Sequence, residues 1–116
     1  MLTYSQSTGE MRAADGDLIG IGFSGFDYMQ NKPEFEDVLH GPIPKRTWAI
    51  DAPQLKKDSW ILLLRPISAP VARTALGRFS IQTSDLSHGC INLPKEAVVK
   101  LVELWNKRER TLRVIA

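Results

Sequence analysis

The residues with the clearest chemical potential stand together in one short stretch, Ser-His-Gly-Cys-Ile-Asn at positions 87–92. Cys90 is the only cysteine of the chain, and a cysteine thiolate is a strong nucleophile. His88 can accept the thiol proton or pair with the thiolate. Gly89 lets the backbone turn sharply, so the Gly89 and Cys90 N–H groups can face a carbonyl oxygen as an oxyanion hole does. Because Ser87 can also fix this turn by hydrogen bonding to the backbone, the stretch predicts a cysteine acyl-transfer site.

A lone cysteine also has an ordinary structural interpretation, because cysteine is among the most frequently buried residue types. The surroundings of Cys90 count against it, since small polar residues precede the cysteine and only Ile91 and Leu93 after it resemble core residues. Papain-like chemistry is disfavoured because no histidine follows Cys90. The second histidine, His40, is expected to be a polar loop residue.

The string at residues 87–92 resembles the signature of the YkuD-type L,D-transpeptidases, which act on peptidoglycan stem peptides. The whole chain is similar to the short L,D-transpeptidase-like effectors that type VI secretion systems deliver. The other landmarks of this similarity are the segments LTYSQSTG, LIGIGFSG, NKP and GPIP at residues 2–9, 18–25, 31–33 and 41–44. The resemblance implies a single catalytic domain over residues 1–116, a β-sandwich with the nucleophile in a cleft.

One position departs from the family pattern. The family carries a base histidine upstream of the cysteine, usually in Phe-X-Ile-His, where residues 79–82 of this chain read Phe-Ser-Ile-Gln. The Gln82 amide can donate and accept hydrogen bonds but cannot take a proton near neutral pH. Either His88 serves as the base, or the protein is weakened or inactive. The alternative function is a domain that binds stem peptides or a neutralising partner without turnover.

The resemblance implies an enzyme that acts on peptidoglycan tetrapeptide stems. Cys90 would attack the carbonyl before the terminal D-alanine, and the acyl-enzyme would pass to water or to another amine. The implied partners are stem peptides, with a cognate immunity protein and the secretion machinery as further candidates. Neither a cofactor nor a nucleic-acid or membrane partner is implied. The residues expected to bind substrate are Ser87, Asn92, Arg78 and Tyr28, with Met29 and Asn31 as further candidates for the cleft rim.

Composition limits the other function classes. A chain of 116 residues fits one domain, and its 43% hydrophobic and 24% charged residues are ordinary for a soluble globular protein. A net charge of +2 is too small to identify a partner. One cysteine excludes an intramolecular disulfide, and together with two histidines it predicts no zinc site.

The amino-terminal segment and the length of the apolar runs predict where the protein would work. No basic segment followed by an apolar core opens the chain, so no signal peptide is expected. No apolar run approaches the ~20 residues that span a membrane. A protein made in the cytoplasm would then need a contact-dependent secretion machine to reach the periplasm of a target cell.

The elements that must position the stretch at residues 87–92 are mostly short strands. Alternating apolar residues and turn signals predict several strands within residues 2–25, and a short helix is expected over residues 34–39. Further strands are expected at Thr47–Ile50, at 59–65 as a central strand covered on both faces, at 78–83 and at Thr111–Ile115. Pro94 at a first helical position, followed by an apolar stripe, predicts a helix before the last strand. The fold class is therefore mostly β, a small sandwich or open barrel with one carboxyl-terminal α-helix.

Overall fold

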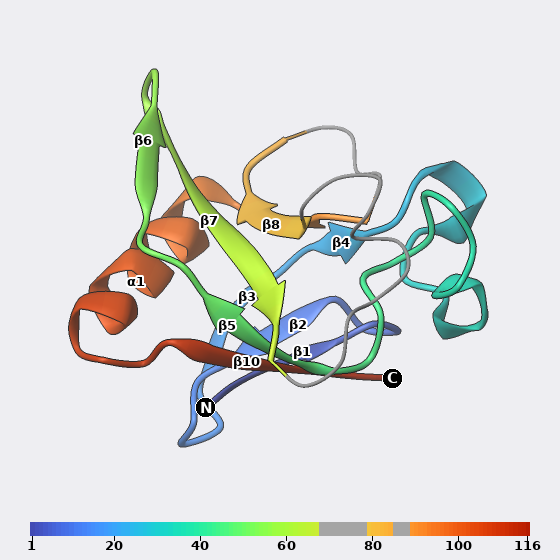
Figure 1. The fold of residues 1–116 in the computed structure, drawn as a ribbon, viewed down its shortest axis with the longest axis horizontal. Helices are drawn as coiled ribbons and strands as arrows, with labels where there is room; N and C mark the ends of the chain where they lie inside the picture. The colour runs from blue at the N-terminus through green and yellow to red at the C-terminus, as the bar shows by residue number, and fades with distance from the viewer. Residues whose placement is uncertain (68–78, 85–88) are drawn as a thin grey trace.

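A computed structural model describes residues 1–67, 79–84 and 89–116 of the chain (Figure 1). These residues form a mostly β fold with one α-helix, α1 (Lys95–Asn106), and two 3-10 helices, η1 (Asp27–Met29) and η2 (Pro33–Phe35). The strands, in chain order, are β1 (Leu2–Ser5), β2 (Glu10–Arg12), β3 (Leu18–Ile21), β4 (Phe23–Ser24), β5 (Thr47–Ile50), β6 (Gln54–Lys56), β7 (Ser59–Pro66), β8 (Phe79–Gln82), β9 (Ile91–Asn92) and β10 (Thr111–Ile115).

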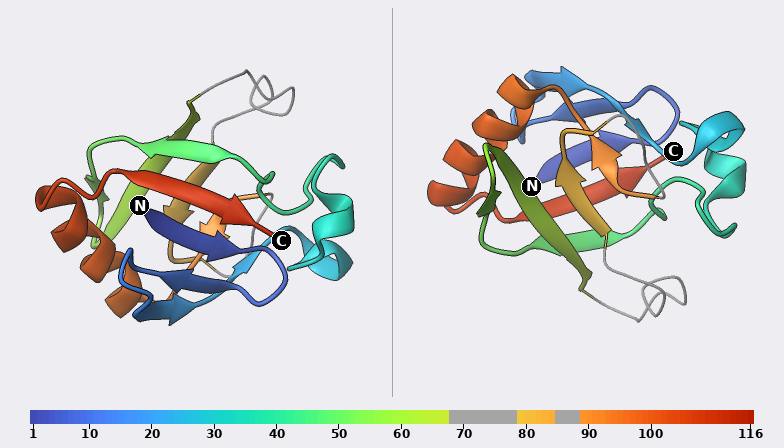
Figure 2. Two further views of the ribbon diagram at one scale, coloured as in Figure 1. Left: turned by 90° about the horizontal axis from the view of Figure 1, so that it is seen from below. Right: turned by 90° about the horizontal axis from the view of Figure 1, so that it is seen from above.

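All of these strands belong to one curled sheet. Its path runs β3-β2-β1-β10-β5-β7-β8-β9-β4, and β6 pairs with β7 outside this path. Neighbours are antiparallel except for two parallel pairs, β1 with β10 and β8 with β9. The two ends of the path, β3 and β4, follow each other in the chain with only Gly22 between them, so the sheet nearly closes on itself as a barrel does (Figure 2). The prediction of a mostly β fold with one carboxyl-terminal helix is confirmed.

The core lies inside this curl and is formed by alternate residues of the strands. Tyr4 of β1, Trp48 of β5 and Val114 of β10 are each at most 2% exposed, as the predicted alternation requires. The helix α1 packs against β3, β7 and β8 and buries Ala97, Val98 and Leu101. In two views, α1 lies at the opposite end of the molecule from the segment that carries η1 and η2 (Figure 2). No helix in the described part of the chain is long and apolar enough to cross a membrane.

The prediction of a helix over residues 34–39 is wrong. Only η2 forms there, and it is followed by turns in which Val38 N–H donates to Phe35 O at 3.0 Å and Gly41 N–H donates to Val38 O at 2.9 Å. Pro33 can begin a helix but Gly41 and the proline after it end one, and the space between them is too short for stable α-helical turns.

The expectation of a central strand at residues 59–65 is correct for one face only. Leu62 and Leu64 are at most 1% exposed, whereas Ile61 and Leu63 on the other face are half-buried. The outer end of β7 pairs with β6, whose three residues are all exposed, so this part of the hairpin projects away from the core. A smaller difference concerns α1, because Pro94 caps the helix instead of occupying its first helical position.

Gly22, which links β3 to β4, lets the chain pass close to the backbone of β9. A Cβ atom at this position would collide with the carbonyl oxygen of Asn92 in β9, which agrees with the close backbone packing that the glycines of this segment predict. We expect Gly22→Ala to lower the free energy of unfolding by about 3 kcal/mol, the upper part of the usual range for overpacking. Urea unfolding followed by circular dichroism measures this loss.

The matched control for this substitution is Gly16→Ala. Gly16 has a φ of 93°, and no atom lies within 4 Å of the Cβ that alanine would add. This variant should therefore lose only about 1 kcal/mol, from backbone strain at a positive φ. A Gly22→Ala protein as stable as the unsubstituted chain would contradict the close approach to Asn92.

Candidate active site around Cys90

The predicted nucleophile lies at the entrance to a very short strand. Cys90 directly precedes β9 and is half-buried. β9 lies between β8, its parallel partner, and β4, its antiparallel partner. Gly89 has a φ of 120°, in a region that glycine tolerates and other residues avoid. The chain thus makes a sharp turn immediately before Cys90, and a glycine is required there.

The register between β8 and β9 determines which side chains share a face with Cys90. Ile81 pairs with Ile91, and both are fully buried in the core. Because side chains alternate between the two faces of a strand, the even-numbered residues here lie on the opposite face. We call this the cysteine face, and its residues are Ser80, Gln82, Cys90 and Asn92.

Ser80 is the cysteine-face residue in contact with the sulfur. Its hydroxyl donates a hydrogen bond to Cys90 Sγ at 3.3 Å, and its side chain is nearly buried, with 5% exposed. A hydroxyl donor stabilises a thiolate more than a thiol, because the negative charge strengthens the bond. Sequence reasoning missed Ser80, although its spacing of two residues from Gln82 places both on one face of the predicted strand.

Gln82 and Asn92 are direct neighbours across the β8–β9 pair. This pair lies two residues further along each strand than the contact between Ser80 and Cys90. Asn92 is 2% exposed. The structure therefore places two amide side chains beside each other on the face that carries the thiol.

A hollow of about 250 Å³ adjoins this face. Asn92 is the cysteine-face residue that contributes to its wall. The volume of this hollow suits one side chain of a ligand better than a whole peptide. The remaining lining residues are Ile21, Gly22, Phe23, Thr83, Ser84, Leu93 and Pro94.

The structure does not describe three of the residues expected at the site, and it places two others on η1. Arg78, Ser87 and His88 lie outside the described residues. Tyr28 is 63% exposed on η1, where its ring meets the Phe35 ring edge-on at 5.6 Å between centroids. Met29 is only 6% exposed, so its assignment to a cleft rim is wrong: the turn of η1 directs it inward.

Asn31 also differs from the expected cleft-rim residue, because its side chain forms hydrogen bonds within the fold. Its Oδ1 accepts from the Ser24 N–H at 3.0 Å and its Nδ2 donates to Gly22 O at 3.2 Å, so it braces the backbone of β4. The same Oδ1 accepts from the Tyr4 hydroxyl at 3.4 Å. Burial raises the pKa of the Tyr4 phenol above its ordinary value, which keeps this donor protonated.

Ser24 is a second residue that sequence reasoning missed. It is fully buried, and its hydroxyl donates to the carbonyl oxygen of Gly89 at 3.0 Å. The sequence signal is weak, because a serine before a glycine is typical of a turn. Only the pairing of β4 with β9, which is not a local property of the sequence, brings Ser24 to the cysteine turn.

No group of three histidine, cysteine, aspartate or glutamate side chains that could hold a metal ion occurs in residues 1–67, 79–84 and 89–116. His40 lies in the loop where it was expected. It has a φ of 68°, its carbonyl accepts from the Phe26 N–H at 2.8 Å, and its ring lies 6.4 Å from the Phe26 ring.

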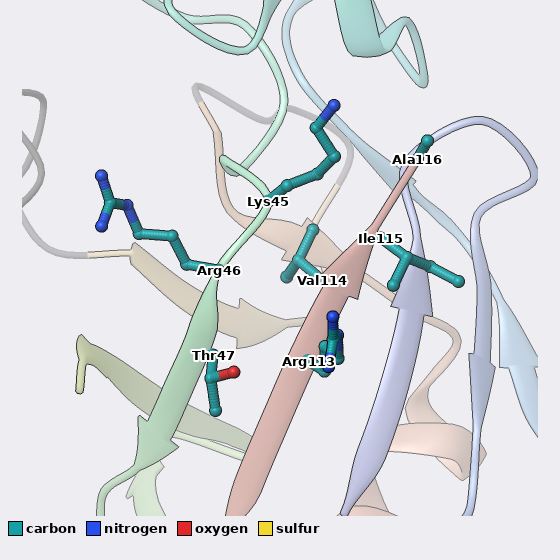
Figure 3. A pocket seen from close by; sticks show the side chains of 7 residues that line it. All are labelled: Lys45, Arg46, Thr47, Arg113, Val114, Ile115 and Ala116. Carbon is teal, nitrogen blue, oxygen red and sulfur yellow. The ribbon is translucent and has the colours of Figure 1, made fainter. Parts of the chain in front are cut away.

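A second hollow, of about 310 Å³, lies at the ends of β5 and β10 and does not belong to the cysteine site (Figure 3). None of its lining residues lies on β8 or β9. Lys45 and Arg46 point in different directions around it, so their charges do not converge on one point (Figure 3). It is lined by Lys45, Arg46, Thr47, Arg113, Val114, Ile115 and Ala116.

No protein-family model matches the chain, and neither a curated protein nor a solved structure shows significant similarity to it. The chemistry of the site must therefore be inferred from the residues themselves. A thiol with a hydroxyl donor, a glycine turn and two neighbouring amides form a set suited to nucleophilic attack by sulfur.

The contact between Ser80 and Cys90 leads to a prediction about thiol reactivity. Ser80→Ala removes the hydrogen-bond donor to Cys90 Sγ. We expect the second-order rate of alkylation by iodoacetamide to fall roughly three- to tenfold, the equivalent of one ordinary hydrogen bond. Ser5→Ala is the control, because that hydroxyl donates to Ala116 O on another part of the sheet. Equal rates in the Ser80→Ala and unsubstituted proteins would rule out a role of Ser80 in activating the thiol.

Proposed function

We propose that the protein is a cysteine acyl-transfer enzyme of the YkuD L,D-transpeptidase type that acts on peptidoglycan tetrapeptide stems. The observation that carries this proposal is the arrangement of the cysteine face. The resemblance aligns Gln82 with the family's base histidine, and the strand register independently puts Gln82 on the face of the only thiol. If the likeness of residues 79–82 to the family pattern were due to chance, position 82 would not need to lie on the face that carries the thiol. The nearly closed, mostly β sheet is compatible with the same assignment.

The reaction would proceed through a thioester. Cys90 Sγ would form a bond to the carbonyl carbon that precedes the terminal D-alanine, and the displaced electron pair would move to the carbonyl oxygen. The Gly89 and Cys90 N–H groups would stabilise that oxyanion. The electron pair would then return as the C–N bond breaks, and the leaving D-alanine amine would take a proton. Attack by water on the thioester would complete L,D-carboxypeptidase activity, and attack by another amine would complete transpeptidation or D-amino-acid exchange.

The proton transfers are the weak part of this chemistry. Gln82 can orient a thiol or a water but cannot accept the proton from either. His88 is the proposed base or thiolate partner, and Ser80 would assist by donating to the sulfur at 3.3 Å. We therefore expect an enzyme that works slowly as its sequence stands.

The proposed setting is that of an antibacterial effector. The protein would be delivered by a secretion machine into the periplasm of a target cell, where stem peptides are found, and the producing cell would carry a neutralising immunity protein. The second candidate function is a stem-peptide-binding or partner-binding domain without turnover. The feature that favours it is Gln82, because a glutamine keeps hydrogen bonding at this position while it removes general base catalysis.

A substitution at position 82 distinguishes the two functions. Gln82→His should raise the rate of D-alanine release from tetrapeptide stems by about 10²-fold or more, since general base catalysis typically contributes roughly 10²–10⁴-fold. The gain should follow a titration near pH 6.5, the ordinary pKa of histidine, and disappear below it as the imidazole becomes protonated. Mass spectrometry of the products across pH 5–9 measures both effects.

The control for this experiment is Cys90→Ala in each background. It should abolish D-alanine release and leave the circular dichroism spectrum unchanged, because no other thiol exists in the chain. If Gln82→His and the unsubstituted protein release D-alanine at equal rates with the same pH profile, position 82 is not the base position. If neither releases any while both bind the stem, the binding function is favoured.

A further inference from the structure

The buried serine behind the cysteine turn has two hydrogen-bond partners from different parts of the chain. Ser24 lies opposite Ile91 in the β4–β9 pair, on the core side of the sheet, and is 0% exposed. Its Oγ donates to the Gly89 carbonyl oxygen at 3.0 Å and accepts from the Ile43 N–H at 2.8 Å. Both contacts are buried, so water does not compete with them.

The Ile43 contact decides where the hydroxyl proton points. An N–H can only donate, so it occupies a lone pair of Ser24 Oγ and leaves the hydroxyl proton for the Gly89 carbonyl. Ile43 is itself held in place, because its carbonyl accepts from the buried Gln6 side chain at 2.9 Å. The same amide nitrogen of Gln6 donates to Glu36 at 2.9 Å. The donor to Gly89 is therefore anchored by a network that extends to the loop after η2.

Gly89 needs an external anchor of this kind. A glycine has few steric limits on rotation, so its own backbone preferences do little to fix the peptide unit that follows it. A trans peptide holds its C=O and N–H in opposite directions. A hydrogen bond that fixes the Gly89 carbonyl therefore also fixes the direction of the Cys90 N–H, and directs it away from Ser24.

We propose that Ser24 is a positioning residue for acyl transfer: by holding the Gly89 carbonyl, its hydroxyl aims the Cys90 N–H at the oxyanion that forms in the reaction. This role rests on the proposed function, since it matters only if a carbonyl is attacked at Cys90. Ser24 touches neither the substrate nor the sulfur in this scheme. It forms and breaks no covalent bond, and its hydroxyl keeps its proton throughout.

The role predicts a specific split between two reactions of the same thiol. Acyl transfer passes through an oxyanion, whereas alkylation by iodoacetamide displaces iodide from a CH₂ group and forms no oxyanion. Ser24→Ala should therefore lower kcat for D-alanine release by about tenfold to 10²-fold, approaching the 10²–10³ lost when one oxyanion donor is removed. KM and the alkylation rate should stay close to those of the unsubstituted protein. A merely structural role would loosen the turn and change both reactions.

The experiment measures both rates in the Gln82→His background, with the Gly89 carbonyl ¹³C NMR signal as a readout that is independent of activity. In Ser24→Ala this signal should move upfield as the hydrogen bond is lost, and in Ser24→Thr, which keeps a hydroxyl, both the signal and kcat should be retained. Trp105→Phe is the control for stability, because it removes a different side-chain donor, which joins α1 to Ile50 O of β5 at 2.8 Å. It should leave kcat unchanged.

Each contrary outcome has a separate meaning. A Ser24→Ala protein with an unchanged kcat overturns the positioning role, and so does an unmoved Gly89 signal. If Ser24→Ala does not fold, a folded Ser24→Thr protein that keeps the Gly89 hydrogen bond but has lost turnover overturns it. Absence of D-alanine release from both the unsubstituted and the Gln82→His proteins, with Ser24 intact, overturns the proposed function and the positioning role with it.

Discussion

The parallel pairing of β8 with β9 is the constraint on which the site depends. Parallel neighbours in a sheet usually need a connection of a dozen or more residues, because the chain must return to its starting edge. Here β8 ends at Gln82 and β9 begins at Ile91, so only residues 83–90 are available. A connection this short leaves no room for a gradual approach to β9. The positive φ of Gly89 and the position of Cys90 at the strand entrance are both consistent with that shortage.

The same pairing separates structure from chemistry on the two faces of one ladder. Ile81 and Ile91 are buried together and hold β8 and β9 against the core. The opposite face carries Ser80 and Cys90, which are joined by a hydrogen bond to sulfur. A slip of one residue in either strand would bury the thiol and expose an isoleucine. The hydrophobic requirement of the core therefore fixes the register that brings the polar residues together.

Local patterns were sufficient to predict much of the fold. The alternation in β1, β5 and β10 and the apolar stripe of α1 are properties of a few consecutive residues, and each produced the expected element. The expectation failed at residues 34–39, where the acidic residues suggested a helix start but Pro33 and Gly41 left too short a segment. The half-covered face of β7 was also missed, because burial of Ile61 and Leu63 depends on which elements pack above them.

The site was predictable only in part, for the same reason. Cys90 and Gly89 stand out by residue type, and Gln82 by resemblance. Ser24 and Ser80 carry no such signal, because serine is common in turns and strands alike and its role here depends on partners 65 and 10 residues away in the chain. Non-local pairing, which periodicity does not encode, brings these hydroxyls to the cysteine turn.

At position 82, the side chain that the fold requires differs from the one that the proposed catalysis requires. The strand needs a side chain that fits beside Asn92 on a half-buried polar face, and an amide meets that need by donating and accepting hydrogen bonds. Neutral histidine has the same two capacities, but it can also bind a proton near neutral pH. A change between the two residues would therefore leave packing and register almost untouched while it altered proton transfer. The arrangement of Ser80, Cys90 and Asn92 is therefore physically compatible with either residue at position 82, and the choice between glutamine and histidine there bears on proton transfer rather than on the fold.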